Sequence, residues 1–241
     1  MIKIIVVENY EEISDKAFEI VKETLENPKA VLGLATGSSP VGLYQRMIQD
    51  HKENRTSYKE ITTFNLDEYL GLARNHKESY YTFMHDVLFD HIDISEDKIH
   101  IPNGSATDVE QEAKDYEAIL QEYQVDLQVL GIGANGHIGF NEPGVSFDSV
   151  THIVDLEEKT RMDNARYFDN DINQVPTQAI TMGIASVMRA KKIVLIAAGE
   201  NKADAIYGMI KGKRTIDLPA SVLQDHMDVT VIVDKAAASK L

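Results

Sequence analysis

The sequence of 241 residues contains no cysteine. Without cysteine, a disulfide, a thiolate metal site and a nucleophilic thiol are all impossible, so any chemistry must come from oxygen and nitrogen side chains. Long hydrophobic runs are also missing: no stretch approaches the roughly 18 apolar residues of a membrane span, and the apolar N-terminal segment 2–7 is too short for a signal peptide. We therefore expect a cytoplasmic protein with no membrane partner.

Positive charge is scarce, because 24 Lys and Arg stand against 39 Asp and Glu and give a formal net charge of -15. Nonspecific binding to nucleic acid or to anionic lipid needs a positive surface, so neither partner is expected. Small polar ligands remain possible, and an anionic one would need a local basic site. No Pro/Gly/Ser-rich tract or block of charge marks a linker, which favours a single domain over residues 1–241.

Short β-branched runs alternate with helical stretches such as Glu11–Glu26, in which apolar residues recur at helical spacing. This rhythm predicts an α/β fold, with a mostly parallel sheet covered by helices on both faces. The predicted buried strands are Ile2–Val7, Ala30–Ala35, Ile61–Leu66, Asp126–Ile132, Lys192–Ala198 and Val229–Val233. Ligands of such sheets bind beyond the carboxyl ends of the strands, so the loops that follow the strands are the candidate site.

The loop after the second predicted strand has the composition of an anion cradle. It supplies Thr36, Gly37, Ser38 and Ser39, and Pro40 suits the first position of the helix that follows. Free backbone N–H groups and the helix dipole there favour a phosphate. The alternative is that Ser38 or Ser39 only caps the helix. A Walker loop is excluded, because no lysine follows the second glycine.

Two adjacent carboxylates, Asp67 and Glu68, lie in the predicted loop after the third strand, Asn65–Tyr69. Neighbouring side chains at a strand end point to opposite sides, so we expect only one of them to face the cleft. A partly buried carboxylate there can act as a general base. The motif alone does not decide between the two residues, or between a base and a capping or solvated acidic pair.

The predicted loop over residues 131–144 carries an unusually polar set: Asn135, His137, Asn141 and Glu142. A histidine beside a carboxylate can be held in one tautomer and move protons, so a His137–Glu142 pair is the favoured interpretation. Metal binding by the same two residues is the weaker alternative, because zinc usually takes three protein ligands.

Three cations could supply the local positive charge: Arg161, Arg166 and Lys202. Lys202 is predicted at the start of a helix, where a lysine opposes the dipole unless an anion is nearby. The alternative for Lys202 is an ordinary exposed lysine, which is the usual case for any single lysine, and Arg161 could likewise be a surface residue.

With these motifs in view, the sequence resembles the glucosamine-6-phosphate deaminase family. The resemblance rests on segments spread over most of the chain: LGLATGSSPVGLY, NLDEYLGL, SYYTFM, IPNG, LGIGANGHIGFNEPG, TRMDNARYF, AITMGI and the Lys202 region. It implies a Rossmann-like fold of the sugar-phosphate isomerase type with no cofactor and no metal. The implied reaction converts glucosamine 6-phosphate and water to fructose 6-phosphate and ammonia, a step of amino-sugar catabolism.

The resemblance also assigns roles. Asp67, rather than Glu68, becomes the base that removes the C2 proton, while His137, with Glu142 and Asn135, opens the sugar ring. The substrate phosphate is placed against the cradle at 36–39, with Arg166 and Lys202 as cationic partners.

Two departures from the family pattern matter. Many members carry Asp where this chain has Asn135, and a neutral amide stabilises an imidazolium less well. Allosteric members have a longer C-terminal segment and, for a second phosphate, Ser, Arg and Lys at the positions of Val145, His152 and Val154. We therefore expect no allosteric site for N-acetylglucosamine 6-phosphate. Separately, we expect a monomer in which the segment His152–Thr181 moves as a lid.

Two other functions compete with this interpretation. A 6-phosphogluconolactonase of related fold would use a similar cradle, but a lactone hydrolase has no carbon-bound proton for Asp67 to remove. A sugar-phosphate sensor domain of a transcription regulator would need an attached DNA-binding module, which a first strand at Ile2 and the negative net charge both disfavour.

Overall fold

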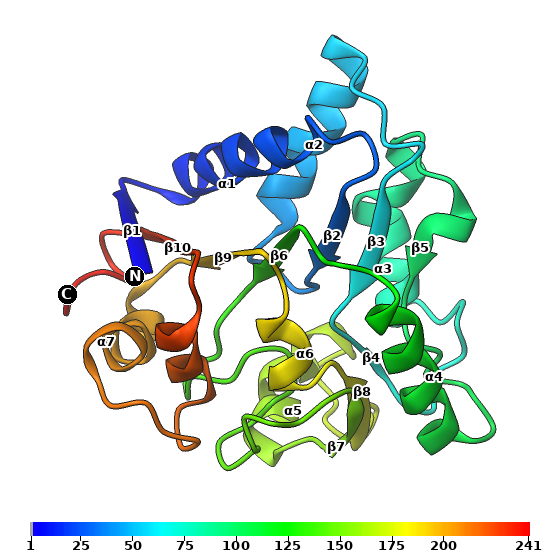
Figure 1. The fold of residues 1–241 in the computed structure, drawn as a ribbon. Coiled ribbons are helices and arrows are strands. Elements are labelled where there is room, and N and C mark those ends of the chain that lie inside the picture. Colours follow the sequence, from blue (N-terminus) through cyan, green and yellow to red (C-terminus); the bar gives the residue numbers. More distant parts are fainter. Residues whose placement is uncertain (1) are drawn as a thin grey trace.

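A computed structural model describes residues 2–241 of the chain (Figure 1). Its central strands are β1 (Ile2–Val7), β2 (Val31–Leu34), β3 (Thr62–Asn65), β5 (Ile99–His100), β6 (Leu127–Leu130), β9 (Lys192–Ala197) and β10 (Val229–Asp234). They form one seven-stranded sheet in the order β1-β10-β9-β6-β2-β3-β5, in which every neighbouring pair is parallel. The six predicted strands are all present, with ends shifted by at most two residues, and the α/β class is confirmed.

Helices cover both faces of this sheet. They are α1 (Tyr10–Thr24), α2 (Val41–Asn54), α3 (Tyr80–Val87), α4 (Val109–Gln121), α5 (Glu158–Asn164), α6 (Ile184–Met188) and α7 (Ala203–Lys211). Short 3-10 turns are η1 (Phe89–His91), η2 (Glu96–Lys98), η3 (Ala165–Tyr167), η4 (Glu200–Lys202) and η5 (Pro219–Asp225). α1, α2 and α3 pack on one face, and α4, α6 and α7 pack on the other.

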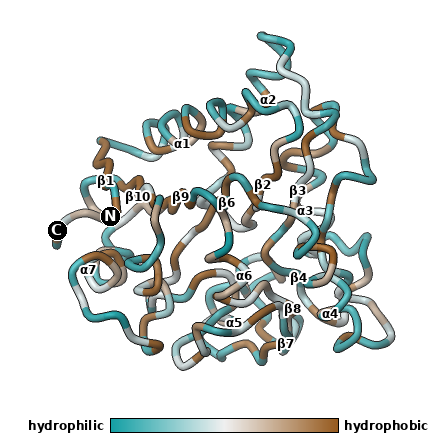
Figure 2. The backbone as a smooth tube through the Cα atoms, in the orientation of Figure 1, coloured by the Kyte–Doolittle hydropathy of each residue, from teal (hydrophilic) through white to brown (hydrophobic). Residues whose placement is uncertain are grey.

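The strands explain why two cores form. Along β10, Val231 and Val233 belong to the core under α4 and α7, whereas Ile232 between them belongs to the core under α1 and α2. Successive side chains of a strand point to opposite faces, so a continuous apolar run buries both faces at once. Each fully buried aliphatic side chain contributes roughly 1.5–3 kcal/mol. Figure 2 shows β1, β9 and β10 as hydrophobic segments, next to helices of mixed hydropathy.

A second, three-stranded sheet was not predicted. It consists of β4 (Asp67–Tyr69), β8 (Gln178–Thr181) and β7 (His152–Asp155), in the order β4-β8-β7 with antiparallel pairing. The prediction that residues 65–69 form a loop was therefore wrong over its second half, because β4 pairs with a strand more than a hundred residues away. The pairing sets Asp67 opposite Thr181.

The chain order of the large sheet reverses between β2 and β6. From β2 the chain adds β3 and β5 on one side, and from β6 it adds β9 and β10 on the other. The loops that leave β2 and β6 therefore diverge and open a crevice, the usual ligand position in such sheets. Ser39, in the loop after β2, lies next to Gly131, in the loop after β6.

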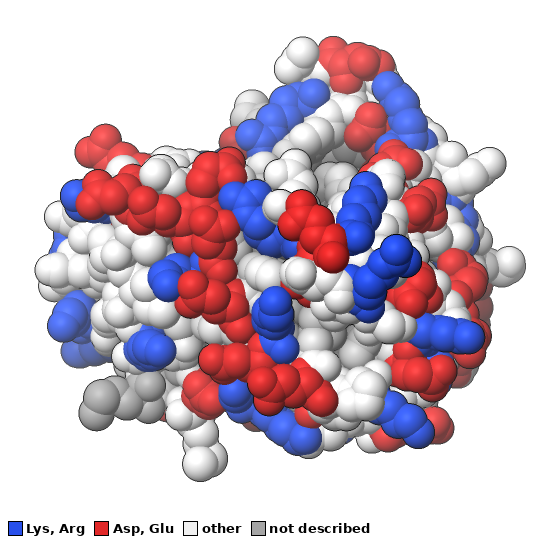
Figure 3. All heavy atoms as spheres, turned by 90° about the horizontal axis from the view of Figure 1, so that it is seen from above, with Lys and Arg blue, Asp and Glu red and all other residues white. Residues whose placement is uncertain are grey.

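The surface contributes little to the choice of partner. Acidic and basic side chains are interspersed on the face above α1 and α2 (Figure 3). Among residues 2–241, no helix is long and apolar enough to cross a lipid bilayer.

Candidate active site

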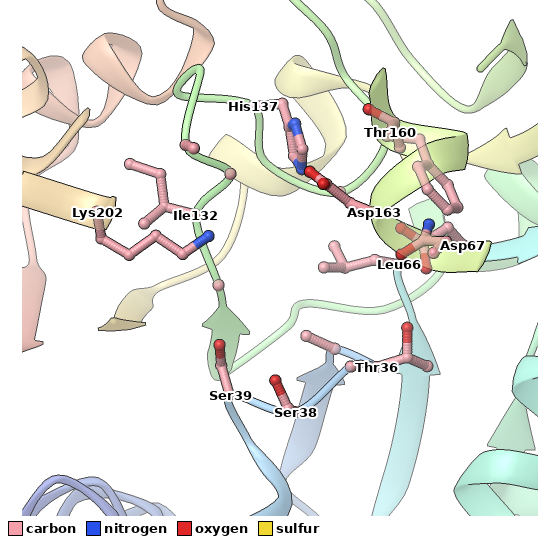
Figure 4. A pocket seen from close by; sticks show the side chains of 18 of the residues that line it. Thr36, Ser38, Ser39, Leu66, Asp67, Ile132, His137, Thr160, Asp163 and Lys202 are labelled. Atoms are coloured by element: carbon pink, nitrogen blue, oxygen red, sulfur yellow. The ribbon is translucent and has the colours of Figure 1, made fainter. Parts of the chain in front are cut away.

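A cavity of about 350 Å³ opens at the crevice between β2 and β6 (Figure 4). Its walls come from the loops after β2, β3 and β6, from α5 with η3, and from η4. Eight of the ten predicted site residues line it: Thr36, Gly37, Ser38, Ser39, Asp67, His137, Arg166 and Lys202. The other two, Asn135 and Glu142, do not line the cavity but contact each other beside His137.

The cradle after β2 has no side-chain cap. Pro40 was predicted at the first position of the helix, but α2 begins at Val41 and Pro40 is its N-cap residue. It makes no side-chain hydrogen bond there. The alternative that Ser38 or Ser39 caps the helix is therefore wrong. Instead, the Tyr10 hydroxyl donates to the Ser38 carbonyl across 2.9 Å and accepts from the Gly42 N–H across 2.8 Å, which fixes the loop from outside.

Gly37 is the position of the cradle that requires glycine. Its φ of +82° lies in the left-handed region, where a side chain is strained. Ser38 and Ser39 follow it on the wall of the cavity. The cradle thus places hydroxyl side chains at the start of a 14-residue helix, whose dipole favours an anion.

Asp67 and Glu68 separate as strand alternation predicts. Asp67 lines the cavity, whereas Glu68 points away from it and accepts hydrogen bonds from the N–H groups of Tyr69, Tyr80 and Tyr81 at 2.8–2.9 Å. Two of these donors belong to the first turn of α3. Glu68 therefore serves the fold as the anion at the N-terminus of α3.

The environment of Asp67 is unusual for a carboxylate. Its side chain is only 5% exposed, and burial, together with the negative charge of Glu68, raises its pKa to about 8. Burial also raises the pKa of Glu68, but the three N–H donors oppose that effect. A carboxyl group that titrates near neutral pH can exchange a proton with a carbon acid, which an ordinary exposed aspartate does poorly.

His137 is backed by a carboxylate. Its Nδ1 lies 3.3 Å from Oε2 of Glu142, and the same oxygen accepts a hydrogen bond of 2.7 Å from the side-chain amide of Asn135. Oε1 of Glu142 accepts a hydrogen bond from the hydroxyl of Thr160. Burial alone would raise the pKa of Glu142, but His137, Thr160 and Asn135 outweigh it and lower the pKa below its usual value. Glu142 is thus held as a carboxylate next to the imidazole.

Two glycines and one asparagine shape the loop that carries His137. A Cβ on Gly133 would overlap the His137 ring, so the ring packs directly on the backbone at this point. Gly136 has a φ of +85°. Asn141 is fully buried and donates to the carbonyls of Ile138 and Met182 across 2.9 and 2.8 Å. Asn141, one of the polar set noted in the sequence, therefore holds the loop and does not line the cavity.

Of the three candidate cations, two reach the cavity. Lys202, directly before α7, and Arg166, in η3, both line it. Burial lowers the pKa of Lys202, and the nearby charge of Arg166 lowers it further, while Asp163 acts in the opposite direction. Arg161 is structural, because its guanidinium donates to the carbonyls of Ile172 and Val175.

Sequence reasoning missed several side chains of the cavity wall, among them Tyr80, Thr160 and Asp163. Asp163 extends into the cavity from α5, and Lys202 extends into it from the other side (Figure 4). The segment TRMDNARYF was noted for its arginines, and helical spacing from Arg166 would have placed Asp163 on the same face. Nothing in the sequence indicated that Thr160 meets Glu142.

Within residues 2–241, no group of three or more His, Asp or Glu side chains is arranged to hold a metal ion. The alternative of a metal on His137 and Glu142 lacks further ligands, since the groups next to Glu142 are the amide of Asn135 and the hydroxyl of Thr160.

Comparisons with known proteins agree with this geometry. Residues 8–232 match the family described as glucosamine-6-phosphate isomerases/6-phosphogluconolactonase. The chain is 54% identical over 241 residues to the glucosamine-6-phosphate deaminase of Halalkalibacterium halodurans, covering 99% of this chain and 98% of the relative.

Solved structures give the same pattern. A monomeric glucosamine-6-phosphate deaminase of the NagB superfamily superposes with a TM-score of 0.97 at 47% identity, covering 99% of this chain and all of that one. A 6-phosphogluconolactonase from Trypanosoma brucei superposes with a TM-score of 0.82 at 19% identity, covering 100% of this chain and 99% of that one, a likeness of fold alone.

Proposed function

The chain belongs to the family of glucosamine-6-phosphate isomerases and 6-phosphogluconolactonases, and on that premise we propose that it is a glucosamine-6-phosphate deaminase. It converts glucosamine 6-phosphate and water to fructose 6-phosphate and ammonia. The observation that carries the proposal is the meeting, in one cavity, of a buried carboxyl group with a raised pKa, a histidine backed by a carboxylate, and a cation-lined anion cradle.

The phosphate end of the substrate binds at the cradle. The hydroxyls and N–H groups of residues 36–39 face it from the start of α2, and Arg166 and Lys202 supply opposite charge. The chain as a whole is strongly acidic and would repel an anion. This local pair of cations therefore allows the doubly charged phosphate of the substrate to bind. The cavity volume lies at the small end of the range of ligand pockets, which suits a single hexose phosphate.

Ring opening is the work of His137. Its imidazole takes the proton of the anomeric hydroxyl and delivers a proton to the ring oxygen, which breaks the C1–O5 bond and leaves an open-chain aldehyde. Glu142, held ionised by Asn135 and Thr160, keeps the imidazole oriented and stabilises its protonated form.

Isomerisation and deamination then use Asp67. Its carboxylate removes the proton on C2 to give an enolamine, and the same proton is delivered to C1, which moves the double bond to C2=N. Water adds to this C2 imine, and the amino group leaves as ammonia, which generates the C2 ketone. No electron sink beyond the substrate's own nitrogen is needed, so the mechanism uses no cofactor.

The choice of deaminase over lactonase rests on identity and on chemistry. Identity reaches 54% with a deaminase, but only 19% with a lactonase of the same fold. The deaminase reaction gives the buried Asp67 a carbon-bound proton to remove, whereas the hydrolysis of a lactone removes no proton from carbon.

The proposal extends to the state of the protein. We expect a monomer of about 27 kDa, located in the cytoplasm and unresponsive to N-acetylglucosamine 6-phosphate. The monomeric deaminase that superposes on this chain supports the first of these expectations.

The deciding experiment supplies glucosamine 6-phosphate and measures ammonia and fructose 6-phosphate together. The two products should appear in equal amounts with the wild-type protein and fall to background with Asp67→Asn. Consumption of 6-phosphogluconolactone without ammonia release would replace the proposed function by the lactonase activity.

A further inference from the structure

Thr160 connects two parts of the site that are far apart in the chain. It lies on α5, only 7% exposed, and its hydroxyl donates to Oε1 of Glu142, in the loop after β6. Of the groups that lower the pKa of Glu142, Thr160 is the only one on α5. Any displacement of α5 therefore reaches the carboxylate through this contact.

The segment that carries Thr160 also carries Arg166, the proposed partner of the substrate phosphate. α5 continues directly into η3, and the Ala165 N–H bonds back to the carbonyls of Arg161 and Met162, so the two turns form one helical rod. Arg166 follows in η3, on the wall of the cavity. Because Arg166 follows Thr160 by six positions in this rod, the two side chains move together.

Glu142 is clamped at both oxygens. Oε1 is bound by Thr160, and Oε2 is bound by Asn135 and lies 3.3 Å from Nδ1 of His137. Two donors on opposite oxygens fix the plane of a carboxylate, whereas one donor leaves it free to turn. The Thr160 bond therefore determines how Oε2 faces the imidazole.

We propose that Thr160 is a positioning residue that couples phosphate binding at Arg166 to the orientation of the Glu142–His137 pair. An anion in the cradle draws Arg166 and its helix toward the cavity, and Thr160 transmits that placement to Glu142. The phosphate, which takes no part in the bond changes, thereby promotes ring opening. This inference rests on the proposed function for its meaning in catalysis.

The test compares Thr160→Val, which keeps the shape and removes the hydroxyl, with Thr160→Ser, which keeps the hydroxyl. Loss of a hydrogen bond to a charged group should lower kcat of the Val variant roughly 10- to 100-fold, with KM for glucosamine 6-phosphate changed less than about threefold. The Ser variant should regain most of the wild-type kcat. A Val variant with wild-type kcat, or a Ser variant as impaired as Val, overturns the proposal.

A second measurement needs no turnover, so it separates this inference from the proposed function. The ring ¹⁵N signals of His137, assigned by their loss in His137→Asn, are followed while inorganic phosphate is added. They should shift in the wild type and stay unchanged in Thr160→Val at saturating phosphate. Signals that do not respond in the wild type, or that respond equally in the Val variant, contradict the coupling.

If Thr160→Val does not fold, Arg166→Gln tests the same coupling by removing the side chain that is proposed to bind phosphate. Arg166 is exposed, so its replacement leaves the fold intact. Phosphate held by Lys202 and the cradle should then leave the His137 signals unshifted. A shift as large as in the wild type overturns the proposal.

Discussion

The side-chain amide of Asn135 donates a hydrogen bond of 2.7 Å to Oε2 of Glu142, the same oxygen that lies 3.3 Å from the His137 ring. Asn135 also accepts the backbone N–H of His137 at its own Oδ1. One amide thus supports both members of the pair. A carboxylate at this position could accept the N–H but could not donate to Glu142 unless it were protonated.

Asn135→Asp should accordingly make Glu142 easier to protonate, even though a second carboxylate would stabilise the imidazolium of His137. The lost donor and the added negative charge both raise the pKa of Glu142, so the carboxylate protonates at a higher pH than in the wild type. We expect the acid limb of the pH profile of kcat to move to higher pH by about one unit. Asn27→Asp, which adds the same charge at an exposed loop, should leave the profile unchanged. Equal profiles for Asn135→Asp and the wild type would contradict this account.

Asp67→Asn should change stability as well as activity. The pKa of Asp67 is raised from 3.8 to about 8, so between these values the folded protein keeps a proton that the unfolded chain has lost. Wild-type stability therefore falls as pH rises through this window. The Asn variant has no such loss, and its gain in Tm over the wild type should grow from about pH 5 to about pH 9. Thermal unfolding across that range checks the sign, and a difference independent of pH would refute it.

Asp163→Asn should tighten anion binding. The Asp163 carboxylate lines the same cavity as Lys202 and acts electrostatically on it, so it also repels a phosphate there. Removing its charge should lower the Kd for inorganic phosphate roughly three- to tenfold, measured by calorimetry at low salt. Glu158→Gln is the matched control, because it removes one negative charge from the same helix outside the cavity. An equal gain in phosphate affinity in both variants would show that the effect comes from the net charge of the protein and not from the position of Asp163.

Gly133→Ala should displace the His137 ring. A Cβ at position 133 overlaps the ring, whereas a Cβ at Gly131 meets only Ser39, at an ordinary 3.7 Å. A misplacement of about 1 Å costs on the order of 100-fold in rate, so kcat of Gly133→Ala should fall by about that factor. The His137 ring ¹⁵N signals should move in Gly133→Ala and stay in place in Gly131→Ala. Unmoved signals in both variants would show that the ring does not depend on this glycine.

Predictions from the sequence succeeded where the burial that shapes the structure also leaves a local pattern of apolar and polar residues in the sequence. A continuous apolar run such as Ile193–Ala197 must be buried on both faces, which only an interior strand achieves, and so it marked β9. Strand alternation likewise separated Asp67 from Glu68. Two-residue β5 carries too short a pattern to be detected.

The missed features depend on contacts between distant segments. The sequence of Asp67–Tyr69 is typical of a polar loop. It forms a strand only because it pairs with β8, which lies beyond residue 177 and leaves no local signal. Thr160 looks like an ordinary helical residue until α5 is placed beside the loop after β6. The proposed lid over His152–Thr181 stays a prediction: its two ends are β7 and β8, paired with each other, and α5 and η3 lie between them.

The separation of Asp67 from Glu68 has a consequence for how such a scaffold can diverge. The two residues are neighbours with the same charge, yet one binds the first turn of α3 and the other faces the cavity. A descendant that kept this architecture but abandoned proton abstraction could replace Asp67 freely, while Glu68 would still be required for folding. Retention of the second acid without the first would therefore mark a relative that has inherited the scaffold and lost the chemistry.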